Sequence, residues 1–191
     1  MPIIDIKHSQ TSMLAFWRIE LDTDYLELIN RLPSSDRNIV LKATSQKQRR
    51  ERLSSRLCAK EILKEDYQGI DYLESGKPFL VNNAMNLSIS HSGDVVCLAF
   101  SDIDEIGVDI QLVSEKVRRV SKRVFNEEEL IWADDNIGRL TELWCIKESV
   151  YKAAQIKGLD FRCGIQIQSN MEFFDVTVNN LLVERKYKVK T

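Results

Sequence analysis

The chain starts a new structural pattern at IGVDIQLV, residues 106–113. Apolar residues occupy every second position of this stretch, which predicts a strand with one apolar face. Gly107, Asp109 and Gln111 share the opposite, polar face. Because the polar face of a strand is usually just solvated, Asp109 is a candidate for chemistry only if acids from elsewhere in the chain join it.

A second stretch, RLTELWCIKESVYKAAQIK at residues 139–157, is predicted to be a helix. At 100° per residue, its core-facing stripe comprises Leu143, Ile146, Val150, Ala153 and Ala154. Trp144, Glu148 and Lys152 follow one another at a spacing of four on the opposite flank. A solvated Glu–Lys pair, which stabilises a helix by only about 0.3–0.5 kcal/mol, is the ordinary interpretation. The tryptophan argues against a merely solvated face.

Between these two stretches, FNEEEL at residues 125–130 supplies further carboxylates. Acids from three separate elements, Asp109, Glu148 and the carboxylates of residues 127–129, can therefore converge on one place. Mg²⁺ binds a few carboxylates and leaves positions open for phosphate oxygens and water. The sequence thus predicts a magnesium–pyrophosphate site.

Polar and basic residues upstream could bind phosphate. Lys77 lies in the turn GKP at residues 76–78, and Ser90 and His91 end a predicted strand. Each has an ordinary alternative, because turn lysines are commonly solvated and turn serines commonly bond to nearby backbone. The basic run at residues 47–60, which includes Arg56, could equally be the wet face of a helix.

The composition limits the class of protein. The chain has 191 residues, a hydrophobic fraction of 43% and a formal net charge of −2. A packed core is expected, and a generally basic nucleic-acid binder is not. Four scattered cysteines and two histidines make a zinc site improbable and favour free thiols in a reducing cytosol.

The amino terminus does not have the pattern of a signal peptide, because charged residues precede only a short apolar run at residues 13–17. The sequence also lacks a stretch of the length that a membrane span needs. We therefore expect a soluble, cytoplasmic protein.

The same order of elements is predicted in each half of the chain. The first half is predicted to contain strands at residues 14–21, 87–90 and 94–101. Its predicted helices are one capped by residues 22–24 and running to about residue 32, one that begins at residue 33, and one at residues 45–67. After residue 106, helices are predicted at 114–124, 127–135 and 139–157, followed by two or three strands. The halves share no clear sequence repeat, so a duplication is inferred from this order alone.

The motifs GKP, SISHS, IGVDI, F…E, WCIKESVYK and KGL, taken in this order, resemble the 4′-phosphopantetheinyl transferase superfamily over roughly residues 50–159. The resemblance is to its larger, pseudo-dimeric class, which includes the surfactin-synthetase-activating enzyme. It implies an α+β fold of two similar α/β subdomains, each a small, mostly antiparallel sheet packed with helices. Residues 1–103 would contact coenzyme A and its nucleotide phosphates, residues 104–191 would carry the metal and catalytic residues, and the active site would lie at their interface.

The resemblance also implies a reaction. Such enzymes transfer 4′-phosphopantetheine from coenzyme A to a serine of an apo acyl or peptidyl carrier protein, with Mg²⁺ or alternatively Mn²⁺. By motif position, the metal ligands would be Asp109, Glu129 and Glu148, with Gln111 as a further ligand through water. Glu148 and Lys152 would be catalytic, as base for the carrier serine and as support for the leaving group. The residues implied to hold coenzyme A are Arg56, Lys77, Ser90, His91 and Lys152.

The implied partner is a carrier protein that is acidic around its serine-bearing helix; we expect neither nucleic acid nor membrane as a partner, and a monomer. Two alternatives remain open. The first alternative is a non-catalytic relative that binds coenzyme A or a carrier protein. Two features suit it: many members of the class carry a glutamate where this chain has Gln111, and the carboxyl end is short for the class. A nucleic-acid module using residues 47–60 is disfavoured by the overall acidity.

Overall fold

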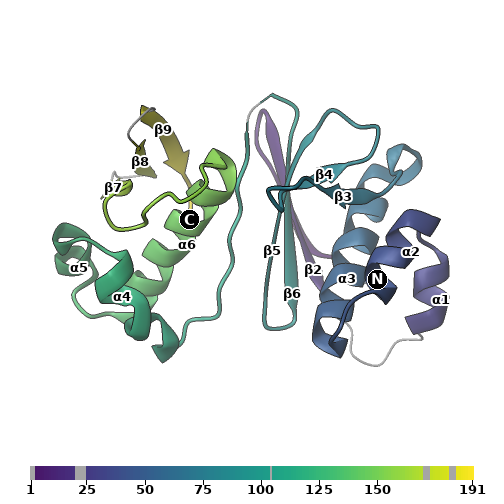
Figure 1. Cartoon of the computed structure of the whole chain (residues 1–191), viewed down its shortest axis with the longest axis horizontal. Helices are drawn as coiled ribbons and strands as arrows, with labels where there is room; N and C mark the ends of the chain where they lie inside the picture. Colours follow the sequence, from purple (N-terminus) through teal and green to yellow (C-terminus); the bar gives the residue numbers. More distant parts are fainter. Residues whose placement is uncertain (1–2, 20–24, 104, 170–172, 181–183) are drawn as a thin grey trace. The chain divides into compact units, whose positions relative to one another are not determined.

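The computed structural model describes residues 3–19, 25–103, 105–169, 173–180 and 184–191. The chain divides into two compact units, Met1–Val108 and Asp109–Thr191, called here the amino-terminal and carboxy-terminal units. Helices accompany small antiparallel sheets in each unit (Figure 1). The predicted α+β class is therefore confirmed.

The amino-terminal unit is built around a four-stranded antiparallel sheet with the order β1-β2-β6-β5. Its strands are β1 (Ile3–His8), β2 (Ser12–Arg18), β5 (Asn86–Ser92) and β6 (Val95–Ser101). A separate hairpin pairs β3 (Ile70–Tyr72) with β4 (Pro78–Leu80) around the predicted GKP turn. Strand β1 was not predicted, because its alternation of apolar and polar residues is weak.

Three helices accompany this sheet, and the longest packs against its central strands. They are α1 (Tyr25–Asn30), α2 (Ser34–Leu41) and α3 (Gln46–Leu63), the last continued by a 3₁₀ turn, η1 (Lys64–Asp66). Helix α3 begins where Ser45 accepts a hydrogen bond from the Gln48 amide, and it packs against β2 and β6. The predicted cap of α1 at residues 22–24 lies outside the described residues.

The carboxy-terminal unit combines a long helix with a three-stranded antiparallel sheet of order β7-β8-β9. Its elements are η2 (Glu115–Val117), α4 (Arg118–Val124), α5 (Glu127–Ala133), α6 (Ile137–Ala154), β7 (Ile165–Ser169), β8 (Phe174–Asn179) and β9 (Glu184–Val189). Helix α6 packs against the sheet and against α4 and α5 (Figure 1). Phe161 and Ile167 touch both apolar clusters of this unit and so join them into one core.

The predicted strand at residues 106–113 is wrong. The described residues 105–114 contain no strand. The Val108 amide donates to the Ser88 hydroxyl, a side-chain acceptor, at 3.0 Å. Leu112, predicted to face the core, is 63% exposed. Alternation of residues predicts an extended backbone, but a strand also requires a partner strand in register.

The two units share a general design: each packs an 18-residue helix, α3 or α6, against an antiparallel sheet. The sheets differ, with four strands in one unit and three in the other. The closer likeness expected of a pseudo-dimer stays a prediction. Among the helices described, none combines the length and apolar character needed to cross a lipid bilayer.

Candidate active site

An ion pair joins the start of the carboxy-terminal unit to its long helix. Lys152 Nζ, near the end of α6, lies 2.8 Å from Asp109 Oδ1. The Asp109 side chain is 7% exposed and that of Lys152 is 29% exposed. The two predicted site residues, 43 positions apart in the chain, therefore meet at a partly accessible place.

Glu148 belongs to the same group. It lies one helical turn before Lys152 on α6 and is half-buried. Burial raises the pKa of Glu148, the negative charge of Asp109 raises it further, and the charge of Lys152 opposes both effects. A neighbouring negative charge of this kind also favours binding a cation, because a positive charge relieves the repulsion between the two carboxylates.

Cys145 is a member of this group that the sequence analysis missed. Burial raises the pKa of the Cys145 thiol to about 12, and the charge of Asp109 and a hydrogen bond to that carboxylate add to the rise. The thiol is therefore protonated at neutral pH. Its spacing of three from Glu148 and seven from Lys152 is the signal that could have placed it on this flank of the helix.

Glu129 lies elsewhere in the same unit. Its Oε2 is 2.8 Å from Lys147 Nζ, and both side chains are almost completely buried, at 2% and 0% exposure. Backbone amides of Asn126, at 2.9 Å, and Ile167, at 3.3 Å, also donate to this carboxylate. Glu129 thus completes the capping box of α5, and its burial among protein donors does not fit the expected role of a metal ligand.

Lys147 received no role in the sequence analysis, although a signal was present. It lies at helical spacing from Leu143 and Val150, and therefore within the apolar stripe of α6. A lysine in such a stripe requires buried partners. Burial lowers the pKa of Lys147, and its hydrogen bond to Glu129 opposes that effect.

Mg²⁺ in proteins requires oxygen ligands, commonly from carboxylates. In the described part of the chain, no three histidine, cysteine, aspartate or glutamate side chains gather as a metal centre. The charge of Asp109 nevertheless acts on Glu148, and Mg²⁺ commonly binds one or two carboxylates while keeping waters and substrate phosphates. Gln111, two residues after Asp109, is exposed and offers an amide oxygen. These residues fit a magnesium ion held jointly with a phosphate ligand.

The predicted phosphate-binding residues of the amino-terminal unit have different surroundings. Lys77 is half-buried in the turn between β3 and β4, and Ser90 is buried on β5. His91 is the next residue of β5 and so faces the other side of the sheet, where its Nδ1 lies 3.1 Å from Glu51 Oε1 of α3. The imidazole therefore already has a carboxylate partner, and a shared phosphate site stays a prediction.

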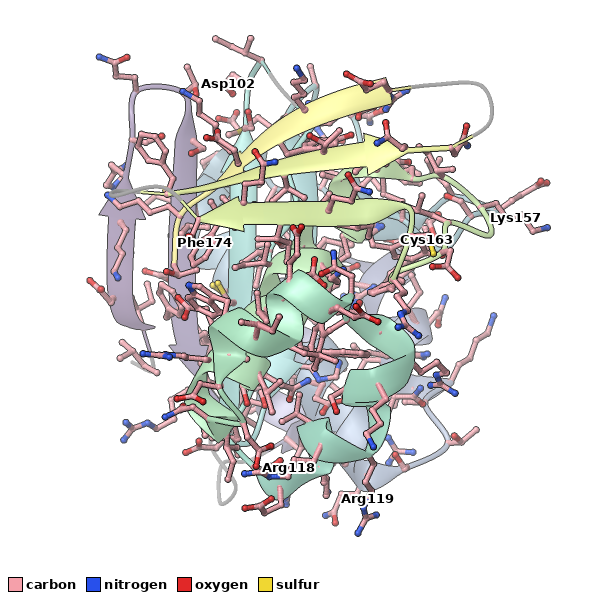
Figure 2. The ribbon with its side chains drawn as sticks, turned by 90° about the vertical axis from the view of Figure 1, so that its left-hand side faces the viewer. Asp102, Arg118, Arg119, Lys157, Cys163 and Phe174 are labelled. Atoms are coloured by element: carbon pink, nitrogen blue, oxygen red, sulfur yellow. The ribbon has the colours of Figure 1, made fainter. Side chains whose placement is uncertain are left out.

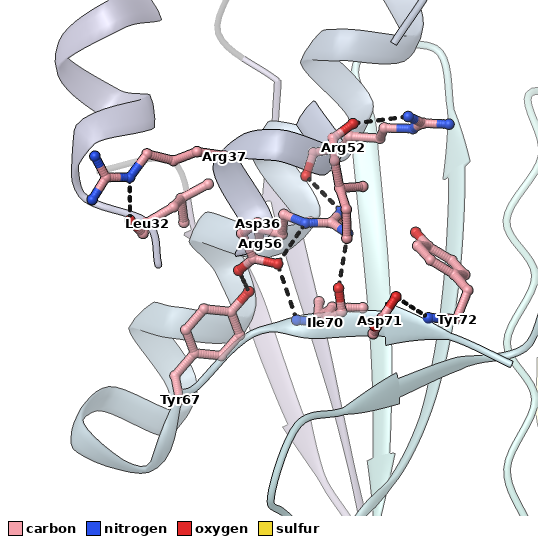
Figure 3. Close-up of polar contacts among 11 residues, drawn as sticks. Leu32, Asp36, Arg37, Arg52, Arg56, Tyr67, Ile70, Asp71 and Tyr72 are labelled. Carbon is pink, nitrogen blue, oxygen red and sulfur yellow. Dashed lines mark hydrogen bonds and ion pairs between the residues drawn. The ribbon is translucent and has the colours of Figure 1, made fainter. Parts of the chain in front are cut away.

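Arg56 lies in the core of the amino-terminal unit (Figure 3). Its Nε is 2.9 Å from Asp36 Oδ1, and its two terminal nitrogens donate to the carbonyls of Ile70 and Arg52. Because the side chain is 0% exposed, this arrangement does not fit the expected contact with a coenzyme A phosphate. The guanidinium of Arg56, on α3, instead links this helix to α2 and to β3 through hydrogen bonds (Figure 3).

The carboxy-terminal unit is similar in sequence to a known class of transferases. Residues 105–187 match the family model of the 4′-phosphopantetheinyl transferase superfamily. This segment, which holds Asp109, Glu148 and Lys152, is thus similar to the same superfamily that the motifs resemble.

Individual transferases are also similar in sequence to this part of the chain. The 4′-phosphopantetheinyl transferase gsp of Aneurinibacillus migulanus is 38% identical over 85 residues, which cover 42% of this chain and 35% of that protein. The 4′-phosphopantetheinyl transferase AcpT of Escherichia coli K12 is 31% identical over 91 residues, 44% of this chain and 47% of that protein. The chain thus spans less than half the length of these curated relatives.

Proposed function

We propose that this protein transfers the 4′-phosphopantetheine group from coenzyme A to a serine of an apo acyl or peptidyl carrier protein in a magnesium-dependent reaction. The meeting of Lys152 with Asp109, next to Glu148, carries this proposal. It occurs inside the segment that matches the transferase superfamily. Phosphoryl transfer depends mainly on positioning and charge neutralisation, which these groups can provide.

In the proposed reaction the carrier serine oxygen forms a bond to the phosphorus next to the pantetheine arm. The bond from that phosphorus to the bridging oxygen breaks, and adenosine 3′,5′-bisphosphate leaves. Asp109 and Glu148 would hold Mg²⁺, with Gln111 contributing through a water molecule. The ion would supply charge neutralisation of the pyrophosphate.

The side chains of α6 would act on protons and charge. Glu148 has a raised pKa and is half-buried, properties that suit a base for the serine hydroxyl. Lys152 would place its ammonium at the departing phosphate oxygen. Its ion pair with Asp109 holds the side chain in place before the reaction begins.

The proposed partner is a carrier protein with acidic residues around the serine. Helix α4 offers basic residues for it: Arg119 projects from this part of the carboxy-terminal unit (Figure 2), and Lys122 and Arg123 follow in the last turn. Opposite charges increase the rate of association. A reducing cytoplasmic setting is part of the proposal, in keeping with free thiols at all four cysteines.

The test is intact-mass analysis of apo carrier proteins from fatty-acid, polyketide and peptide synthesis, incubated with this protein, coenzyme A and Mg²⁺. At least one carrier should gain a single phosphopantetheine, and EDTA should abolish the gain. Glu148→Gln should lower turnover at least about a hundredfold, whereas Glu142→Gln on the same helix should not. An unchanged mass for every carrier would contradict the proposed function, as would coenzyme A binding without product.

A further inference from the structure

The ammonium group of Lys147 has three acceptors inside the carboxy-terminal unit. Its Nζ lies 2.8 Å from Glu129 Oε2 and 2.6 Å from each of the carbonyl oxygens of Phe161 and Ile165. An ammonium group has three donors, so every donor of Lys147 has a protein acceptor. With its side chain fully buried, Lys147 does not contact substrate.

The acceptors come from different parts of the unit. Glu129 belongs to the first turn of α5, Phe161 to the turn after α6, and Ile165 to the start of β7. Glu129 adds a link to β7 through the Ile167 amide at 3.3 Å. One buried ion pair thus joins α5, α6, the turn and β7.

The turn after α6 is held to the helix a second time, by aromatic contacts. The ring of Phe161 stacks on Trp144, with centroids 6.0 Å apart, and contacts Tyr151 at 5.2 Å. These two aromatic residues flank Lys147 along α6. Residues 157 and 163 belong to the same turn, where the labelled Lys157 and Cys163 lie at the surface (Figure 2).

We propose that Lys147 and Glu129 are positioning residues of the transferase site, which fix the rotation of α6 about its axis. Glu148 follows Lys147 directly and projects about 100° around the helix. Its direction, and that of Lys152 one turn later, depends on this rotation. The pair therefore acts on the reaction through the orientation of these two side chains toward Asp109, and this inference rests on the proposed function.

The first test is Lys147→Met, which keeps a long, unbranched side chain and removes the ammonium group. Variants are compared only where circular dichroism shows them folded. We expect kcat to fall at least about tenfold, while KM for coenzyme A and the Mg²⁺ concentration giving half-maximal activity stay within about threefold. Lys186→Met, on the exposed side of β9, should behave as wild type.

The second test separates positioning from metal binding. Glu129→Gln should lower kcat without shifting the half-maximal Mg²⁺ concentration by more than about threefold. If additional Mg²⁺ restores wild-type turnover, Glu129 is a metal ligand and the inference is overturned.

The third test does not depend on activity. Hydrogen exchange of the amides of residues 148–152 should be faster in Lys147→Met than in wild type and unchanged in Lys186→Met. Wild-type kcat in folded Lys147→Met overturns the inference whatever the exchange result, and so does a lower kcat with unchanged exchange. If wild type transfers nothing, the proposed function fails, and exchange alone decides whether the pair orients α6.

Discussion

The carboxylate of Asp36 and the guanidinium of Arg56 form an ion pair at 2.9 Å, and neither side chain is exposed. The same carboxylate accepts hydrogen bonds from the Tyr67 hydroxyl at 2.6 Å and from the Ile70 amide at 3.1 Å. Removing Asp36 would leave a buried cation without its counter-charge. We expect Asp36→Ala to lower the free energy of unfolding by about 3–5 kcal/mol, measured by urea denaturation.

The chain offers an exposed control for this experiment. Arg31, directly after α1, pairs with Glu27 on that helix, and their side chains are 59% and 66% exposed. Arg31→Ala should therefore cost less than about 1 kcal/mol. Similar losses for Asp36→Ala and Arg31→Ala would show that the network around Arg56 does not support the fold.

Local geometry explains which parts of the site could be predicted from the sequence. Glu148 and Lys152 are four residues apart on a helix, so helical periodicity alone places them on one flank. The helices at residues 45–67 and 127–135 were predicted for the same reason and are confirmed with shifted ends. Helix ends depend on capping and on contacts beyond the helix, which a periodic pattern does not contain.

Tertiary pairing explains what could not be predicted. Arg56 finds its acid 20 residues earlier in the chain, and Glu129 finds Lys147 on another helix. A motif position does not reveal which of two charged groups will be buried with its partner and which will face solvent. The strand predicted at residues 106–113 is wrong for a related reason, because an alternating sequence describes one segment whereas a strand is defined by two.

Lys152 provides a direct test of the candidate active site. Lys152→Met should lower kcat by about 10²–10³, because the charge at the leaving oxygen is lost. Arginine at this position keeps a charge near Asp109 and should recover part of the rate. Steady-state transfer to a carrier protein measures both variants, and a Lys152→Met enzyme with wild-type kcat would remove this residue from the mechanism.

Gln111 provides a test of the metal site. Gln111→Glu adds a carboxylate two residues after Asp109, on an exposed side chain. The additional charge should lower the Mg²⁺ concentration giving half-maximal activity by about three- to tenfold. Activity measured across a magnesium titration gives this value, with Gln166→Glu on β7 as a control. An unshifted titration would mean that residue 111 does not approach the ion.

Gly164 precedes β7 in a place without room for a side chain. A Cβ there would lie 2.7 Å from the Asp160 carbonyl oxygen and 2.7 Å from Leu159 Cδ1. Gly164→Ala should therefore cost about 1–3 kcal/mol in unfolding free energy. In contrast, Gly138→Ala in the first turn of α6 meets a single atom, the Oδ1 of Asn136 that caps the helix, at 3.1 Å, and should cost less than Gly164→Ala.

Buried thiols and phenols predict a loss of stability at alkaline pH. Burial raises the pKa values of Cys58, Cys145 and Tyr25 to about 12. In the unfolded chain these groups lose their protons nearer pH 8.5 for thiols and pH 10 for tyrosine. Between those values and pH 12 the folded state binds more protons than the unfolded state, so the free energy of unfolding must fall as pH rises.

Cys58, which is fully buried, isolates one contribution to this alkaline effect. Each such thiol lowers stability by at most about 1.4 kcal/mol per pH unit above pH 9. Urea denaturation at pH 7.5, 9 and 10.5 should show a steeper decline for wild type than for Cys58→Ala. Cys163→Ala, at an exposed thiol, should retain the wild-type slope. Equal slopes for wild type and Cys58→Ala would mean that this thiol ionises as readily in the folded protein as in the unfolded chain.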